Sequence, residues 1–389
     1  MTVQPLDVNA HLHTPYSFSA FDSLSEALDM AKNEGVSVVG INDFNSFDGY
    51  AEWSQECEKR KLYPLFNVEF ICMQEEYRAK GILVNDPNNP GRTYISGKGL
   101  EFPIRLSGKP AEEIADVRRE TNDHAKQMCD KMNELLAKIN ADFEINFEKV
   151  KKEFTKGDIR ERHLAKALRI KIYKKFNDNA SEITSFLERI FRGKKLNSHV
   201  EDTAAVENEI RGNLLKMGGA AFVVEGPKAF LPMSTVCNII LSAGGIPTYP
   251  FLADDEKDRF TDFERDVKKT VEMLKKHRIY SVEFITARNS MKVLEQYSGY
   301  LHDHGFIVTF GSEHNTPDKK PVLLSTREGA PLSKKLKKIN YAGACIVAAH
   351  QNAIKNRITG YVDMNGKADA ENRELWIKEG NKLIRKIVG

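Results

Sequence analysis

The sequence has few of the features that mark secreted, membrane-bound or disulfide-stabilised proteins. Its five cysteines are widely spaced and form no CxxC pair, which argues against a disulfide framework and against a structural zinc knuckle. No apolar run reaches the roughly 18 residues needed to cross a bilayer, and the first residues lack the basic and apolar segments of a signal peptide. We therefore expect a cytoplasmic protein without a membrane partner.

An excess of charge of one sign is also missing. The 58 basic and 55 acidic residues leave a net charge of +3, so there is no electrostatic reason to expect a nucleic-acid polymer as a partner. The sequence contains no GxGxxG motif, no P-loop and no GxSxG elbow, so nothing in it favours a dinucleotide-binding enzyme or a serine hydrolase.

The first 70 residues alternate between strand and helix patterns. Ser23 and Glu26 form a capping box at the start of a predicted helix, and Gly35 supplies its end. Predicted strands cover residues 8–13, 36–41 and 65–72. The nearly continuous apolar run of the second is typical of a strand buried on both faces of a parallel sheet. This alternation predicts an α/β fold.

Three further segments follow, each with its own character. Pro, Gly and Asn residues between 85 and 108 predict a loop, and the helical patterns after it make residues 85–219 a helix-rich insertion or cap. The strand–helix alternation returns over 220–325, so we expect residues 1–84 and 220–325 to form one α/β domain. Residues 326–389 are predicted to be a helical C-terminal extension.

Two histidines end the first predicted strand. His11 and His13 lie two residues apart, and residues at that spacing point to the same side of a strand, so both imidazoles can reach one ion. Active sites of parallel α/β folds form at the carboxyl ends of the strands, which is where this pair lies. Two histidines on an exposed strand are the alternative.

Two acids lie near the ends of the next strands. Glu69 has apolar neighbours in its strand, and a buried carboxylate needs a partner, a role that a metal would fill. Asp43 emerges from a buried strand into a polar turn, where it can orient a ligand or a water molecule. From the residues alone, a turn-capping role for Asp43 is equally compatible.

The order of these pieces resembles the PHP (polymerase and histidinol phosphatase) family. That family has an HxH near the start, an acid-bearing turn about 30 residues later and a strand-ending Glu about 25 residues beyond, as this chain does. Residues 162–168, 244–250, 281–285 and 311–315 resemble later segments of the family. The resemblance implies a distorted (β/α)7-type barrel with a helix-rich insertion that carries His163 toward the site.

The resemblance also implies a set of metal ligands. It places His11, His13, Glu69 and Glu313 in one site, and His163 in a second site whose other histidine is replaced here by Tyr249. The histidines of the family's third site correspond to Ser19, Phe44 and Asn315. We therefore expect one firm divalent metal site (zinc, manganese or iron), a weaker second site and no third site.

We expect the residues that bind the substrate to lie around these metal ligands. Arg160 and Arg162 lie beside His163 in the sequence, where a guanidinium could hold a phosphate with two hydrogen bonds, although a solvated helix face is the commoner place for such residues. Tyr249, His314 and Asn315 complete the predicted group. Tyr249 could instead pack at a strand end, and His314 could replace a lost metal ligand only if its loop were reshaped.

The sequence therefore predicts a metal-dependent hydrolase of the phosphoesterase type. Its substrate would be a small phosphorylated metabolite or nucleotide, attacked by a metal-activated water that Asp43 orients. One alternative is a mononuclear hydrolase or lyase acting on a sugar-like or amide substrate. Another is a non-catalytic ligand-binding protein on the same scaffold.

Overall fold

The computed structural model describes residues 4–226, 228–255 and 258–389. Its central feature is one sheet of seven strands in chain order. The strands are β1 (Asp7–Leu12), β2 (Val36–Phe44), β3 (Tyr63–Met73), β4 (Arg92–Lys98), β5 (Ile246–Phe251), β6 (Ser281–Ile285) and β7 (Ile307–Gly311). Neighbouring strands are parallel except at β4, which runs antiparallel to both β3 and β5.

The sheet curls until its first and last strands meet. Leu12 forms a parallel bridge with Glu313, just beyond β7. The backbone N–H of His13 donates to the Glu313 carbonyl over 2.8 Å, and the N–H of Glu313 donates to the His11 carbonyl over 3.0 Å. We call this meeting of β1 with the end of β7 the closing seam. It makes the sheet a nearly closed barrel and confirms the predicted distorted α/β barrel.

Helix α12 (Lys334–Lys355) fills the part of the seam where β1 and β7 do not pair directly. The Asn340 side chain donates to the Val8 carbonyl on β1 over 3.0 Å and accepts from the Phe310 N–H on β7 over 2.8 Å. Gly343 lets the helix come this close, because a Cβ there would lie 2.1 Å from the Val308 carbonyl oxygen. A helix in the predicted C-terminal extension thus packs against the barrel itself.

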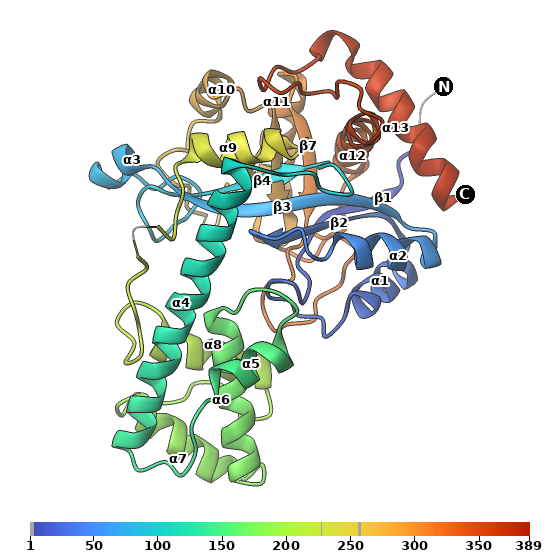
Figure 1. The fold of residues 1–389 in the computed structure, drawn as a ribbon. Helices are drawn as coiled ribbons and strands as arrows, with labels where there is room; N and C mark the ends of the chain where they lie inside the picture. The colour runs from blue at the N-terminus through green and yellow to red at the C-terminus, as the bar shows by residue number, and fades with distance from the viewer. Residues whose placement is uncertain (1–3, 227, 256–257) are drawn as a thin grey trace.

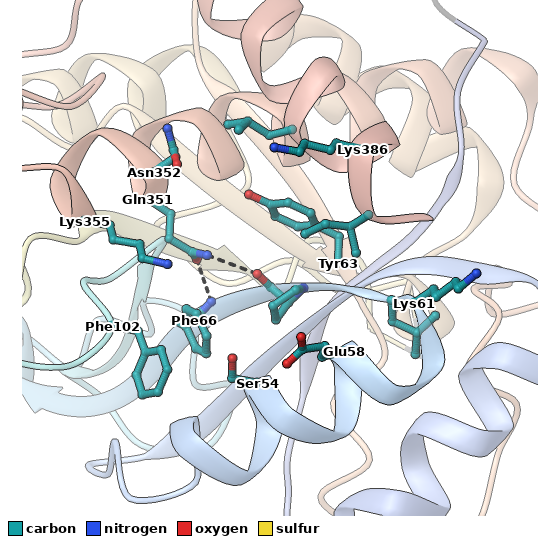
Figure 2. Close-up of a pocket in the computed structure, with 14 residues that line it drawn as sticks. Ser54, Glu58, Lys61, Tyr63, Phe66, Phe102, Gln351, Asn352, Lys355 and Lys386 are labelled. Atoms are coloured by element: carbon teal, nitrogen blue, oxygen red, sulfur yellow. Dashed lines mark hydrogen bonds between the residues drawn. The ribbon is translucent and has the colours of Figure 1, made fainter. Parts of the chain in front are cut away.

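The same helix also holds the start of β3. Gln351 accepts from the Phe66 N–H over 2.9 Å and donates to the Pro64 carbonyl over 3.1 Å (Figure 2). Beside this clamp lies a pocket of about 540 Å³ between β3, α2 (Tyr50–Arg60), α12 and α13 (Arg373–Val388). It opens at the amino end of β3, whereas Glu69 lies further along the strand toward its carboxyl end.

The remaining barrel helices bury apolar faces on the sheet. Ser23 caps α1 as predicted, because it accepts from the Glu26 N–H over 3.1 Å. Glu26 accepts from the Asp22 N–H over 2.8 Å, one residue before the cap, so the second bond of a capping box is not formed. The helices that bury apolar faces are α1 (Leu24–Asn33), α9 (Met233–Ser242), α10 (Val267–Lys276) and α11 (Met291–Asp303), whereas the short α3 (Glu75–Ala79) has no buried residue. No helix in the described ranges combines the length and apolar character that crossing a membrane requires.

The loop prediction for residues 85–108 is wrong over β4. Thr93, Tyr94 and Ile95 favour a strand, and the surrounding Pro, Gly and Asn residues concealed that signal. β4 pairs with β3 and β5 and therefore belongs to the barrel, although it lies inside the segment predicted as an insertion.

The helical block after β4 has a hydrophobic core of its own, made by residues between Ala125 and Ala221. Its elements are α4 (Lys109–Lys138), α5 (Phe147–Phe154), α6 (Glu161–Lys175), α7 (Ala180–Ile190), α8 (Thr203–Ile210) and a π-turn (Arg211–Leu215). The block extends away from the sheet, with α4 running from the barrel along it (Figure 1). It returns to the barrel before α6, where the Lys156 N–H donates to the Pro15 carbonyl over 2.8 Å.

Candidate metal centre

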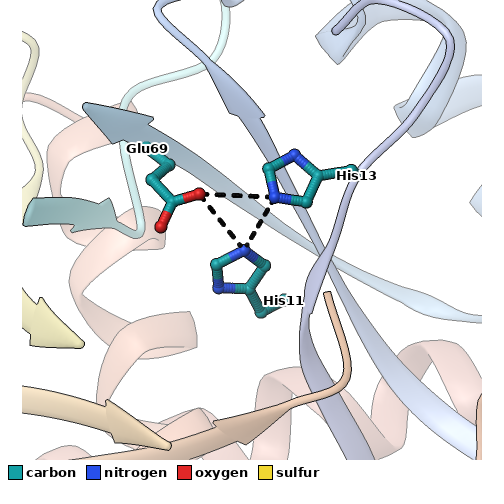
Figure 3. A group of neighbouring side chains, drawn as sticks. All are labelled: His11, His13 and Glu69. Carbon is teal, nitrogen blue, oxygen red and sulfur yellow. Dashed lines mark hydrogen bonds and ion pairs between the residues drawn. The ribbon is translucent and has the colours of Figure 1, made fainter. Parts of the chain in front are cut away.

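Three side chains meet inside the barrel near the carboxyl ends of β1 and β3. The Nε2 atoms of His11 and His13 lie 3.2 Å apart. Glu69 Oε2 lies 3.3 Å from His13 Nε2 and 3.7 Å from His11 Nε2 (Figure 3). All three residues are buried. We call them the donor triad.

The spacing of the donor triad fits a divalent ion. Donors about 2.0–2.2 Å from a tetrahedral ion lie roughly 3.3–3.6 Å apart, close to the three distances found here. Glu69 Oε2 is buried and, within the described residues, has no hydrogen-bond partner. A buried carboxylate oxygen without a partner is costly, and an ion between these atoms would satisfy it.

The pKa shifts of the donor triad also favour a bound cation. Burial raises the pKa of Glu69 to about 8, and the neighbouring carboxylates of Glu313 and Glu283 add to the rise, which His11 opposes. Burial, together with His11, holds the pKa of His13 well below its ordinary value. The imidazole of His13 is therefore neutral, the form that coordinates a metal, and the carboxylate lacks a cation.

Asp43 reaches the triad through Ser17. His13 Nδ1 lies 3.2 Å from Ser17 Oγ, and the Ser17 hydroxyl donates to Asp43 Oδ1 over 2.5 Å. Thr14 donates to Asp43 from its backbone N–H over 2.8 Å and from its hydroxyl over 2.5 Å. Burial raises the pKa of Asp43 to about 6, although the Ser17 and Thr14 hydrogen bonds oppose the rise. Both carboxylate oxygens are occupied, so in this structure Asp43 orients His13 through Ser17 and does not face the triad.

Asp43→Asn should therefore weaken metal binding without removing a ligand. The amide would replace an acceptor by a donor and disturb the Ser17 hydroxyl that holds His13. Loss of such an outer partner typically costs about 10–100-fold in metal affinity, which competition with a chelator would measure. Asp48→Asn removes an acid that pairs with Arg118 outside the site, and it should leave the affinity unchanged. Equal affinities of the two variants would contradict this role of Asp43.

A second buried carboxylate, which the sequence did not suggest as a site residue, holds the other side of His11. Glu283 Oε2 on β6 lies 3.0 Å from His11 Nδ1 and 2.6 Å from Lys98 Nζ on β4. The Ser96 hydroxyl donates to Glu283 Oε1 over 2.5 Å. Burial opposes the ionisation of Glu283, but Lys98 and His11 bring its pKa well below the ordinary value. The sequence feature that could have indicated Glu283 is the same as for Glu69: a single Glu in an apolar strand.

Glu313 lies beside the triad but is not one of its three members. Its backbone forms the closing seam, with a φ of 65°, and its carboxylate pairs with Arg288. Its negative charge nevertheless acts on both His13 and Glu69. No sequence signal pointed to Arg288.

The residues predicted around His163 divide between the barrel and the helical block. His163 is buried in the first turn of α6, and its Nδ1 accepts from the Arg160 N–H over 2.9 Å. The Arg160 guanidinium lies 4.4 Å above Phe44, and Phe44 stacks 4.7 Å from His13. Arg162 donates to Asn208 over 3.1 Å, inside the helical block. Within the described residues, His163 is not close enough to join the donor triad.

The remaining predicted residues lie in other contacts. Both ring nitrogens of His314 are engaged: Nδ1 lies 2.7 Å from Ser312 Oγ and Nε2 lies 2.8 Å from the Lys320 carbonyl. Asn315 follows it, partly buried, in the same loop. Ser19 donates to the His13 carbonyl over 2.8 Å. Through these contacts, His314 and Ser19 hold the loops that surround the site.

Tyr249 does not reach the barrel interior. It is 1% exposed, and its hydroxyl donates to Glu264 Oε1 over 2.9 Å. Its neighbour Thr248 bonds Ser281 across the sheet over 2.8 Å. Since side chains alternate along a strand, Tyr249 points outward, against Phe251 and Phe263. Its predicted substrate contact is not supported by this position.

Comparison with known proteins agrees with the fold. The model of the PHP domain matches residues 9–197, and no curated protein sequence matches the chain significantly. A proposed metal-dependent phosphoesterase from Bifidobacterium adolescentis is similar in structure, with a TM-score of 0.54, 15% identity, and coverage of 86% of this chain and 96% of the other. An amidohydrolase from Chromobacterium violaceum, solved with sulfate and no metal, also has a TM-score of 0.54 and 15% identity, with coverages of 84% and 94%. At this identity the likeness shows the fold.

Proposed function

We propose that this chain, whose residues 9–197 match the PHP domain model, is a metal-dependent hydrolase of the phosphoesterase type, acting on a small phosphorylated metabolite or nucleotide. The observation that carries the proposal is the donor triad, in which the buried Glu69 Oε2 has no hydrogen-bond partner among the described residues. An ion held by these three residues would supply Lewis acidity and would lower the pKa of a bound water to about 7.

The chain's own residues provide the rest of the proposed site. His11 and His13 present their Nε2 atoms to one point, because Glu283 and Ser17 hold their Nδ1 atoms. Arg160 supplies positive charge beside them: its guanidinium lies over Phe44, and it is in no ion pair with another described residue. A guanidinium free of carboxylates can hold a phosphate with two hydrogen bonds.

Arg160→Ala should mainly reduce the use of phosphate esters. A hydrogen bond to a charged group contributes about 1.5–3 kcal/mol, so kcat/KM for a phosphate monoester should fall by about 10–100-fold. Arg189→Ala is the matched control, because Arg189 lies over Phe186 in the helical block in a similar Arg–Phe contact. If both variants kept wild-type kcat/KM, Arg160 would not be a substrate contact.

The proposal itself is tested by metal content and turnover together. Protein purified without chelator should contain at least one zinc, manganese or iron ion per chain and hydrolyse p-nitrophenyl phosphate or a nucleotide. His11→Ala combined with His13→Ala should abolish both the bound metal and the hydrolysis. Hydrolysis that survives this double change would overturn the proposal.

A second candidate is a mononuclear hydrolase or lyase acting on a sugar-like or amide substrate. It is favoured by one observation: within the described part of the chain the donor triad includes neither His163 nor Glu313. One metal per chain, with turnover of amides or lactones and none of phosphate esters, would select this candidate. Ligand binding without any turnover would instead point to a binding protein.

A further inference from the structure

The barrel interior holds two buried carboxylates on opposite sides of one imidazole. His11 turns Nδ1 toward Glu283 over 3.0 Å and Nε2 toward Glu69 over 3.7 Å. Glu69 is 2% exposed and Glu283 is not exposed at all. Buried carboxylates require a positive charge or a full set of hydrogen bonds, so the partners of these two decide where a further cation can bind.

Glu283 finds its cation within the chain. Lys98 Nζ lies 2.6 Å from Glu283 Oε2, and neither side chain is exposed. The same ammonium donates to Asn42 Oδ1 over 3.0 Å and to the Ala10 carbonyl over 3.2 Å. An ammonium has three N–H donors, and these three contacts use all of them. Ser96 donates to the other Glu283 oxygen, so Glu283 is neutralised and fully bonded.

Glu69 has no such partner. Its Oε2 faces the two histidines without a hydrogen bond to any described residue. The two carboxylates therefore offer unequal sites to a divalent ion: Glu69 has an oxygen without a hydrogen-bond partner among the described residues, whereas Glu283 is already paired with Lys98. An ion placed on the Glu283 side of His11 would also meet the fixed positive charge of Lys98, and like charges in a low-dielectric interior repel strongly.

We propose that Lys98 takes the place of a second divalent ion in the barrel. It neutralises Glu283, which then accepts from His11 Nδ1 and keeps His11 Nε2 directed at the donor triad. It thereby limits the interior around His11 to one ion, bound by the triad. This role rests on the proposed metal site, and it adds a determinant of metal number that lies on β4.

Lys98→Met tests the proposal, because methionine is similar in length and carries no charge. In equilibrium dialysis against zinc, the wild-type chain should bind one ion that His11→Ala and His13→Ala together abolish. Lys98→Met should bind a second ion, because Glu283 would be left without a cation. Lys98→Met combined with Glu283→Gln should return to one ion. A single bound ion in folded Lys98→Met, or a second ion that persists in the double variant, would overturn the proposal.

If Lys98→Met does not fold, Glu283→Gln with Lys98 intact provides a second test. It leaves the ammonium uncompensated near His11, so zinc affinity should fall by at least about tenfold, given the coupling measured for close charge pairs. Adding Lys98→Met should restore part of that affinity. A purely structural pair would show no such recovery, which would contradict the role of Lys98.

These measurements do not include turnover, which keeps the two proposals separable. A wild-type chain that binds one zinc ion but hydrolyses nothing would contradict the proposed function and leave the pattern expected for Lys98 intact. A wild-type chain that binds no zinc would overturn both.

Discussion

Glu69→Gln should remove the metal and at the same time make the metal-free protein more stable. Glutamine has no negative charge to offer an ion, so the metal affinity should fall by more than about 100-fold, beyond the usual effect of losing an outer partner. In the metal-free protein, however, ionised Glu69 is a liability. It is buried, its Oε2 has no hydrogen-bond partner in the described structure, and burial raises its pKa to about 8.

The raised pKa fixes the sign of the effect. A carboxyl group whose pKa is higher in the folded state than in the unfolded chain favours folding when protonated, and it loses that contribution as the pH rises toward 8. A neutral side chain avoids the loss. Urea unfolding at pH 8 in the presence of a chelator should therefore show a higher midpoint for Glu69→Gln than for the wild type.

Glu264→Gln is the matched control for this prediction. Burial also raises the pKa of Glu264 to about 8, but this carboxylate accepts from the Tyr249 hydroxyl and from the Leu252 and Ala253 N–H groups. Replacing it should cost about 1–3 kcal/mol, because donors would lose their acceptor, and should leave metal affinity unchanged. If metal-free Glu69→Gln were destabilised as much as Glu264→Gln, Glu69 would be a structural residue and not a metal ligand.

Gly311→Ala should damage the fold and the metal centre together. A Cβ at this position would lie 2.2 Å from His11 Cβ and 2.9 Å from the His11 backbone nitrogen. Because backbone cannot rotate away as a flexible side chain can, either β7 or His11 must move. Overpacking typically costs about 1–3 kcal/mol and occasionally more, and we expect the upper end here. The movement of His11 should also reduce metal affinity.

Gly212→Ala provides the comparison. Nothing lies within 4 Å of a Cβ built on Gly212, and alanine is the better helix former, so this variant should be neutral or slightly more stable. Urea unfolding and zinc titration of both variants check the prediction. If Gly311→Ala bound zinc as the wild type does, the close approach of β7 to His11 would have no part in positioning the donors.

The sequence was sufficient to predict that His11, His13 and Glu69 lie close together, because the geometry of the strands largely determines where these side chains point. Two histidines at alternate positions and an acid in an apolar strand needed only a parallel sheet to bring them together. Glu283, like Glu69, is a single acid in an apolar strand, but its segment (residues 281–285) is only matched to a strand of the family and not predicted as part of the site. The outcome shows that a lone carboxylate in an apolar strand indicates a buried charge and does not reveal which cation pairs with it.

Other parts of the site could not be read from the sequence. Lys98 was hidden because its strand lies among turn-forming residues and because lysine is rarely buried without a partner. The pairing of Arg288 with Glu313 depends on the path of two loops. The family pattern points to Tyr249, but the neighbouring Thr248 is the residue that faces inward. Such an offset is invisible without the register of the strands, since a shift of one residue reverses the direction of a side chain.

The closing seam also bears on when the protein can acquire its metal. His11, His13 and Glu69 leave the ribosome well before the Glu283 carboxylate and the Glu313 backbone that hold the two histidines. Joining the two ends of the barrel requires a long-range contact, whose entropic cost must be met before the donors are fixed. We therefore expect a nascent chain to hold an ion only loosely at these histidines until Glu313 has left the ribosome and the seam has closed.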